Sequence, residues 1–342
     1  MKNMNLAEFR NYISNKQIIG FGCGLQGRRM ATILDNWNLL KNVLCYIDND
    51  VTKIGTEYQR GSFSCPIISL DDAMMRYDND VIILITCVDY KSVYQQMAEK
   101  GCQFKDVISI DEITKNQLQV SDYDHIIKES ETPLIPKKIH YAWLGGVMPY
   151  ELKKNVEHWK ELCPDYEFFE WNDQNYDVTV NNYMKQAYER KIWGFVPDYM
   201  RLDVIYKQGG IYLDTDIEMI QRPDEMLYQH CFGCIDGSLT MNLGSGFGAV
   251  AGMDVIKQLR DCYDHVSFVM KDGTINNTPC MSYSYHVLEE YGFKVNDELQ
   301  NVHGMNIYPM IIQGGIQNIK IKKVTNKTFW VHYGCKSWFD KK

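Results

Sequence analysis

Short apolar runs alternate with longer helical stretches along most of this sequence, and one polar stretch interrupts the series. In the first part, the strand-like runs are residues 17–21, 43–47, 81–88 and 107–110. Strands that alternate with helices predict a parallel sheet that is covered by helices. The polar stretch, residues 116–136, contains Pro133 and Pro136, and a second strand–helix series follows it.

The length of 342 residues favours two domains, since one domain usually contains about 100–200 residues. We expect an α/β protein with a Rossmann-like parallel-sheet domain at 1–120, a linker at 121–134 and a second α/β domain at 135–342. In the second domain we expect strands at 138–143, 166–171 and 211–213, and helices at 150–162 and 198–208.

Charge and composition exclude some classes of function. The net charge of −8 argues against a nucleic-acid-binding protein that works through bulk positive charge. The first 17 residues contain no apolar signal region, and the run at 81–88 is far shorter than the roughly 20 residues that span a bilayer. The eleven cysteines are then expected to be reduced thiols. We therefore expect a cytoplasmic protein without a transmembrane segment.

A glycine loop lies near the start of the chain. Gly22, Gly24 and Gly27 form a G-x-G-x-x-G pattern between a strand and a helix, and Asp48 ends the next strand, 21 residues later. This is the context of a dinucleotide-binding fingerprint, in which the glycines approach a pyrophosphate and the acid binds a ribose hydroxyl. The alternative is a first turn that is tight for packing reasons and binds nothing. The ligand of this domain stays open.

The most informative segment is a D-x-D motif that follows a short apolar strand. Asp214 and Asp216 come directly after residues 211–213, and Gly209-Gly210 ends the helix before that strand. Two carboxylates that converge on one point repel each other unless a cation lies between them, and such oxygen ligands suit Mg²⁺ or Mn²⁺. Asp198 and Arg201 are three residues apart on the preceding helix, so they share a face and can pair.

The stretch from Asp198 to Asp216 resembles the signature of glycosyltransferase family 32, whose members carry a D-x-D motif. That family includes bacterial capsular polysaccharide transferases and yeast α-mannosyltransferases. This chain departs from the usual pattern at Pro197, where the family has Ser, and at Leu202, where many members have Tyr. The resemblance implies a GT-A type glycosyltransferase fold for residues 135–342.

Two other segments are similar to the same family. Residues 135–146 resemble its opening strand, which implies that Trp143 stacks on the nucleotide base and that the Ala142 backbone reads the base edge. Residues 332–338 resemble its closing motif. The resemblance implies that His332 completes a metal shell with Asp214 and Asp216, and that the donor is also contacted by Tyr212, Asn242, Ser337 and Trp338.

The resemblance implies a metal-dependent, retaining transfer of a hexose from a nucleotide-diphosphate sugar. Mn²⁺ or Mg²⁺ would be held by Asp216 and His332, with Asp214 acting through the ribose or the water shell of the metal. Asp198 and Arg201 would hold the sugar. A same-face displacement and a covalent intermediate both stay open.

By analogy with bacterial relatives we expect a UDP-hexose rather than GDP-mannose as donor. The expected acceptor is a glycan or lipid-linked saccharide in the synthesis of a surface or capsular polysaccharide. That acceptor would bring the protein to the inner face of a membrane.

Two other readings belong to different classes of function. An NAD(P)-dependent oxidoreductase or epimerase would use the N-terminal glycine loop and a Tyr-x-x-x-Lys pair, which Tyr90, Lys91 and Tyr94 do not form. A non-catalytic regulator would bind a nucleotide sugar without turning it over. The first half of the chain is also similar to Rossmann-like modules attached to bacterial sugar-modifying enzymes.

Overall fold

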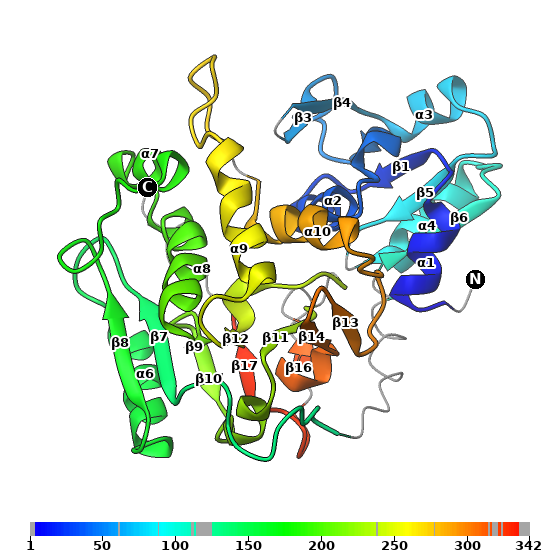
Figure 1. Cartoon of the computed structure of the whole chain (residues 1–342). Helices are drawn as coiled ribbons and strands as arrows, with labels where there is room; N and C mark the ends of the chain where they lie inside the picture. The colour runs from blue at the N-terminus through cyan, green and yellow to red at the C-terminus, as the bar shows by residue number, and fades with distance from the viewer. Residues whose placement is uncertain are drawn as a thin grey trace. The chain divides into compact units, whose positions relative to one another are not determined.

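The computed structural model describes residues 4–60, 62–87, 89–110, 113, 125–236, 239–276, 278–313, 315, 316, 321, 322 and 324–334 (Figure 1). The chain divides into two compact units, Met1–Val120 and Ser121–Lys342. Across the residues just given, the structure contains no helix that is both long and apolar enough to cross a membrane.

The first unit is built on a six-stranded sheet in the order β3-β4-β2-β1-β5-β6. All neighbouring strands from β4 to β6 pair in parallel, and only β3 is antiparallel to its neighbour. The elements of this unit are α1 (Leu6–Ile13), β1 (Ile18–Phe21), α2 (Leu25–Asn36), η1 (Leu40–Asn42), β2 (Val43–Ile47), β3 (Glu57–Arg60), β4 (Phe63–Ile68), α3 (Leu70–Arg76), β5 (Ile82–Ile85), α4 (Tyr90–Glu99) and β6 (Asp106–Ser109).

The predicted Rossmann-like sheet is therefore present in this unit. Its central strands β1 and β5 are entirely buried, as their uninterrupted apolar sequences indicate. The hairpin of β3 and β4 was not predicted from the sequence. β3 is a polar edge strand, and β4 contains Pro66, which lies just before Ile67 and Ile68, the two residues that pair with β2.

The second unit is built on a mixed seven-stranded sheet in the order β13-β14-β11-β12-β9-β7-β8. β7 pairs in parallel with β8 and β9, whereas β12 is antiparallel to both β9 and β11. Its elements up to the acidic motif are β7 (Lys138–Ala142), α6 (Tyr150–Leu162), β8 (Glu167–Trp171), α7 (Asn182–Glu189), η2 (Trp193–Phe195), α8 (Pro197–Gln208), β9 (Gly210–Tyr212) and β10 (Ile217–Met219).

The rest of this unit completes the sheet and adds two small ribbons. β10 pairs with β17 and β15 pairs with β16, both antiparallel and outside the main sheet. These elements are η3 (Asp224–Tyr228), β11 (Cys231–Cys234), η4 (Leu243–Ser245), β12 (Phe247–Ala249), α9 (Asp254–Asp261), η5 (Cys262–His265), α10 (Cys280–Glu290), β13 (Gln300–Val302), β14 (Met305–Tyr308), η6 (Met310–Gln313), β15 (Gly315–Ile316), β16 (Ile321–Lys322) and β17 (Trp330–His332).

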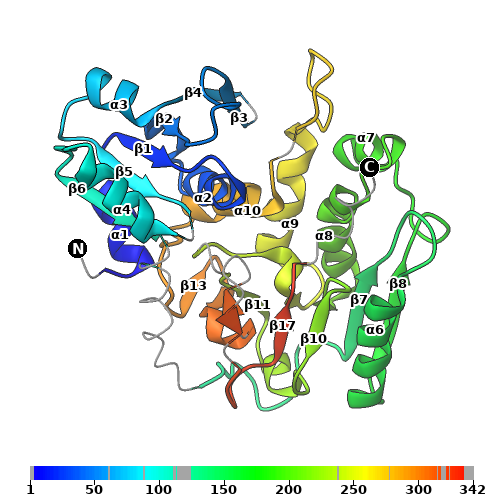
Figure 2. The ribbon, with the colours of Figure 1, turned by 180° about the vertical axis from the view of Figure 1, so that it is seen from behind.

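Helices cover both faces of this sheet (Figures 1 and 2). On one face, Val156 and Trp159 of α6 join Ile139 and Tyr141 of β7 in the main apolar core. Their neighbour His140 points to the other face, where its Nε2 lies 3.0 Å from the Gly209 carbonyl at the end of α8. The mixed α/β sheet fits the GT-A type unit predicted for this half, so the predicted fold class is confirmed.

Two glycines end α8 and start β9 at the centre of the sheet. Gly209 has φ +66° and Gly210 has φ +110°, in the region that side chains other than glycine rarely adopt. A Cβ on Gly210 would also lie 2.8 Å from the Lys138 carbonyl oxygen. The sequence pair therefore allows a buried helix to turn directly into a central strand, which carries the acidic motif at its end.

The described part of the predicted linker, residues 125–134, packs against the second unit. Ile126 and Ile127 contact its apolar core. The backbone N–H groups of Glu129 and Leu134 donate to carbonyls of η3, each at 2.8 Å. Residues 121–124 lie outside the described residues.

Candidate active site

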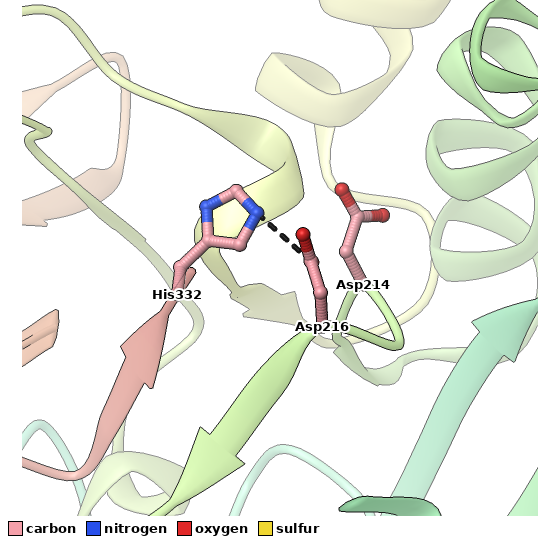
Figure 3. Close-up of side chains that lie close together, drawn as sticks. All are labelled: Asp214, Asp216 and His332. Atoms are coloured by element: carbon pink, nitrogen blue, oxygen red, sulfur yellow. Dashed lines mark ion pairs between the residues drawn. The ribbon is translucent and has the colours of Figure 1, made fainter. Parts of the chain in front are cut away.

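The acidic motif lies in the turn between β9 and β10. Asp214 and Asp216 belong to this turn and not to the strand, and the Ile217 N–H donates to the Asp214 carbonyl at 3.1 Å. β17 pairs with β10 so that Ile217 lies opposite His332. As a result, one potential ligand atom from each of Asp214, Asp216 and His332 lies within 4.8 Å of the others (Figure 3).

The His332 ring is held from both sides. Its Nε2 lies 3.1 Å from Asp216 Oδ1, and its Nδ1 lies 3.0 Å from Ser245 Oγ. Burial alone would lower the pKa of His332, but the carboxylates of Asp216, Asp214 and Asp236 outweigh it and raise that pKa. The side chain is 8% exposed, so the ring is a fixed part of the site.

Arg201 lies between Asp198 of α8 and Asp214 of the acidic turn. Its Nη2 is 3.3 Å from Asp198 Oδ1 and 3.4 Å from Asp214 Oδ1, and its Nε donates to the Pro197 carbonyl at 3.1 Å. The guanidinium carbon also lies 5.3 Å from the centre of the Tyr212 ring. The predicted pairing of Asp198 with Arg201 is thus present, and it extends to Asp214.

The charges of this cluster are unbalanced. Burial raises the pKa of Asp198 to about 7, a shift that Arg201 opposes and Asp214 reinforces. Desolvation also raises the pKa of Asp214, with Arg201 acting against it and the like charge of Asp216 adding to it. A divalent cation between Asp214 and Asp216 would relieve this repulsion. Two carboxylates and one imidazole nitrogen are a ligand set that suits Mn²⁺ and accommodates Mg²⁺.

The loop around η4 supports the acidic turn from behind. The Asp214 N–H donates to the Gly244 carbonyl at 3.3 Å, and a Cβ on Gly244 would lie 2.3 Å from Asp214 Oδ2. Asn242, expected to contact the donor, accepts from the Gly244 N–H at 2.9 Å and donates to Asp236 at 3.4 Å. Its side chain therefore shapes the loop.

Sequence reasoning missed Gly244 and Ser245 as residues of the site. The only signal was the short run Asn242–Gly246, in which two glycines flank a serine. That pattern indicates a turn but does not indicate which distant strand the turn contacts.

The residues expected to bind the nucleotide base lie at the end of β7, the strand next to β9. Carboxyl ends of adjacent parallel strands meet at one edge of a sheet, so Ala142, which ends β7, and Trp143, which follows it, lie on the edge where Asp214 follows β9. Trp143 is partly exposed, and its indole N–H donates to the Gly146 carbonyl at 2.9 Å. Tyr212 is fully buried under Arg201. Ser337 and Trp338 lie outside the described residues.

In the first unit, Gly22 and Gly24 lie in the turn from β1 into α2, and Gly27 lies in the first turn of α2. Gly22 has φ +104°, and a Cβ on Gly27 would lie 2.1 Å from the Gly22 carbonyl oxygen, so backbone conformation at Gly22 and packing at Gly27 already require these two glycines. Asp48, expected to bind a ribose, accepts hydrogen bonds from its own chain. The donors are the N–H groups of Cys23 and Asp50, at 2.8 and 2.9 Å, and Lys53 Nζ, at 3.0 Å.

Comparison with known proteins shows that part of this chain matches a known family model. Residues 149–233 match the family model described as a glycosyltransferase sugar-binding region containing the DXD motif. This match covers α6, α8 and the acidic turn.

Three relatives are similar to this chain over part of its length. Inositol phosphoceramide mannosyltransferase 3 of Schizosaccharomyces pombe is 30% identical over 116 residues, which are 32% of this chain and 33% of that protein. Inositol phosphoceramide mannosyltransferase 2 of the same organism is 33% identical over 105 residues, 29% of this chain and 30% of that protein. Subversion of eukaryotic traffic protein A of Legionella pneumophila is 30% identical over 110 residues, 24% of this chain and 17% of that protein.

The chain thus spans about a third or less of the length of these curated relatives. Among solved structures, PaToxG glycosyltransferase aligns with a TM-score of 0.39 and 13% identity, over 46% of this chain and 68% of that chain. Residues 149–233, which carry the acidic turn and Arg201, are thus similar to the sugar-binding region of the DXD-containing glycosyltransferases.

Proposed function

We propose that the second unit transfers a sugar from a nucleotide-diphosphate donor to a hydroxyl group of an acceptor, and that it needs a divalent cation to do so. The observation that carries this proposal is the convergence of Asp214, Asp216 and His332 within 4.8 Å, beside a buried Arg201. The similarity of residues 149–233 to the sugar-binding region of DXD-containing glycosyltransferases supports it.

Asp216 and His332 would hold the cation, with Asp214 acting through the ribose or through a metal-bound water. The bound cation supplies Lewis-acid stabilisation of the charge that develops on the leaving diphosphate. The two side chains fit this role because each already has a partner in the folded chain: Ser245 contacts His332 Nδ1, and His332 Nε2 contacts Asp216. We propose Mn²⁺ or Mg²⁺ as the ion.

Arg201 and Asp198 would orient the sugar of the donor. Both side chains are buried, and Arg201 is clamped by two carboxylates and a backbone carbonyl. A preorganised group of this kind stabilises developing charge without the cost of reorganisation. Trp143, partly exposed on the same edge of the sheet, would stack on the base. We propose that the anomeric configuration is retained.

For the donor we propose a UDP-hexose, and for the acceptor a glycan or lipid-linked saccharide of a surface polysaccharide. Two relatives are named as mannosyltransferases. A GDP-mannose donor is therefore the main competitor and belongs in the same panel.

The test is a panel of UDP-sugars and GDP-sugars, incubated with the full chain and either Mn²⁺ or EDTA. We expect free nucleotide to be released from one donor with Mn²⁺ and not with EDTA, and the same donor to raise the melting temperature. Stabilisation by a nucleotide sugar without release, even when acceptor saccharides are added, would support a binding regulator. Stabilisation by NAD alone would instead point to the glycine loop.

A further inference from the structure

Ser245 is the hydroxyl that contacts the back of the His332 ring. Its Oγ lies 3.0 Å from His332 Nδ1, on the side of the ring opposite to the Nε2 that faces Asp216. Ser245 is fully buried and His332 is 9% exposed. The contact is therefore shielded from water. In such a buried place a single hydrogen bond fixes a ring more strongly than it would at the surface.

The backbone around Ser245 is built to bring it to this place. The Ser245 N–H donates to the Asn242 carbonyl at 3.1 Å, which closes the short η4 turn. On the other side, Gly246 has φ +110°, and a Cβ there would lie 2.7 Å from the Trp330 ring. Because Gly246 allows this close approach, the loop rests directly on β17, the strand that ends at His332.

A hydroxyl suits the two states that His332 needs. When Nε2 carries the proton and donates to Asp216, Nδ1 is an acceptor, and Ser245 can donate to it. When Nε2 binds a cation it must offer a lone pair, so Nδ1 carries the proton and donates to Ser245. A backbone carbonyl in this position could serve only the second state.

We infer that Ser245 is a positioning residue that aims His332 Nε2 at the proposed cation and holds the ring in both states. The inference rests on the proposed function, because it assigns Ser245 a role only if Asp216 and His332 hold a metal. Outer partners of metal-binding histidines typically change metal affinity about 10–100-fold when they are removed.

The experiment measures the dissociation constant for Mn²⁺ by electron paramagnetic resonance of the free ion, with and without UDP. The variants are Ser245→Ala, which removes the hydroxyl, and Ser245→Thr, which keeps it. Ser284→Ala is the matched control, because Ser284 is also buried in this unit and its hydroxyl bonds to backbone carbonyls such as Met241 O at 3.1 Å. The melting temperature of each metal-free variant reports folding.

We expect Ser245→Ala to bind Mn²⁺ about 10–100-fold more weakly than the natural chain. Ser245→Thr should recover most of this loss, and Ser284→Ala should bind Mn²⁺ as the natural chain does. A second arm repeats Ser245→Ala in a His332→Ala background, where removal of the hydroxyl should have no further effect on affinity.

Three outcomes overturn the inference, and they are distinguishable. If the natural chain binds Mn²⁺ and Ser245→Ala binds it equally well, Ser245 has no positioning role and the proposed function stands. If the natural chain binds no Mn²⁺ with or without UDP, the metal site itself fails and the inference fails with it. If Ser245→Ala lowers affinity as much in the His332→Ala background, its effect does not pass through the ring.

Discussion

His332 Nε2 lies 3.1 Å from Asp216 Oδ1, because β17 and β10 pair with Ile217 opposite His332. Asp216 directly precedes β10, near the middle of the sequence of the second unit, whereas His332 ends β17, 116 residues later. The acidic motif therefore gains the nitrogen of His332 from a strand that is distant in sequence. The site depends on the correct pairing of β10 with β17.

The first prediction concerns this nitrogen ligand. His332→Ala should weaken Mn²⁺ binding by at least about 100-fold, since removal of a direct ligand costs more than removal of its outer partner. Isothermal titration of the full chain with Mn²⁺ measures the change. His303→Ala is the matched control, because His303 lies in the same unit but pairs with a different acid, Asp254, 2.7 Å away. Equal loss in both variants would contradict the assignment.

The second prediction concerns the close packing behind the acidic turn. Gly244→Ala should lower turnover at least about tenfold, because the added Cβ would lie 2.3 Å from Asp214 Oδ2 and must displace that carboxylate. In an Asp214→Ala background the same change should have a much smaller effect, since the closest atoms are gone and only Arg201 Nη1, at 3.1 Å, remains near the added Cβ. Steady-state kinetics of the four proteins form a double-mutant cycle. Strict additivity would show that Gly244 does not act through Asp214.

The third prediction concerns the buried guanidinium. Arg201→Met should lower the free energy of unfolding by about 3 kcal/mol, because the buried Asp198 and the partly buried Asp214 lose their shared cation. Arg201→Lys keeps the charge but loses the planar guanidinium group. It should restore part of the stability that Arg201→Met loses, and little of the activity. Urea denaturation, followed by circular dichroism, measures the free energy of unfolding. If the methionine variant is as stable as the natural chain, Arg201 does not balance these acids.

The fourth prediction concerns pH and the buried imidazole of His140. The Trp171 indole N–H donates to His140 Nδ1 at 3.1 Å, so Nε2 must carry the proton that bonds to the Gly209 carbonyl. Burial lowers the pKa of this neutral ring from 6.5 to about 4. The unfolded chain therefore binds a proton that the folded chain does not, and stability falls as the pH drops from about 6.5 to about 4.

The size of this loss should approach about 3 kcal/mol at pH 4, relative to pH 7. Urea denaturation at several pH values measures it, with His140→Asn as the comparison because asparagine does not titrate. The natural chain should lose more stability than the variant over this interval. Parallel pH profiles for the two proteins would show that His140 does not contribute.

Much of the site could be predicted from local sequence. The glycine pair after α8, the apolar strand and the spacing of Asp198 and Arg201 each follow from periodicity and turn chemistry, and the structure places them as expected. The strands β1, β2, β5 and β6 of the first unit were equally readable from their apolar runs. These features depend on residues that are close in sequence.

The remainder depends on contacts between distant segments. Nothing in the run around Ser245 indicates that this hydroxyl reaches β17, and the polar strand β3 lacks the apolar pattern that marks a strand. Asp48 matches a ribose-binding position by spacing, but Lys53 and two backbone N–H groups already bond to its carboxylate. Such partners become visible only when the chain is folded.

The most direct measurement is the initial rate of nucleotide release from the preferred donor, compared between the natural chain and Asp216→Asn in the presence of Mn²⁺. Asp272→Asn is the matched control, since Asp272 is an exposed acid that only caps its own turn, with Thr274 N–H at 3.0 Å. We predict a rate at least about 100-fold lower for Asp216→Asn, equal to that of the natural chain in EDTA, and an unchanged rate for Asp272→Asn. Release by Asp216→Asn at the rate of the natural chain would contradict the assignment of this acid to a metal-dependent sugar transfer.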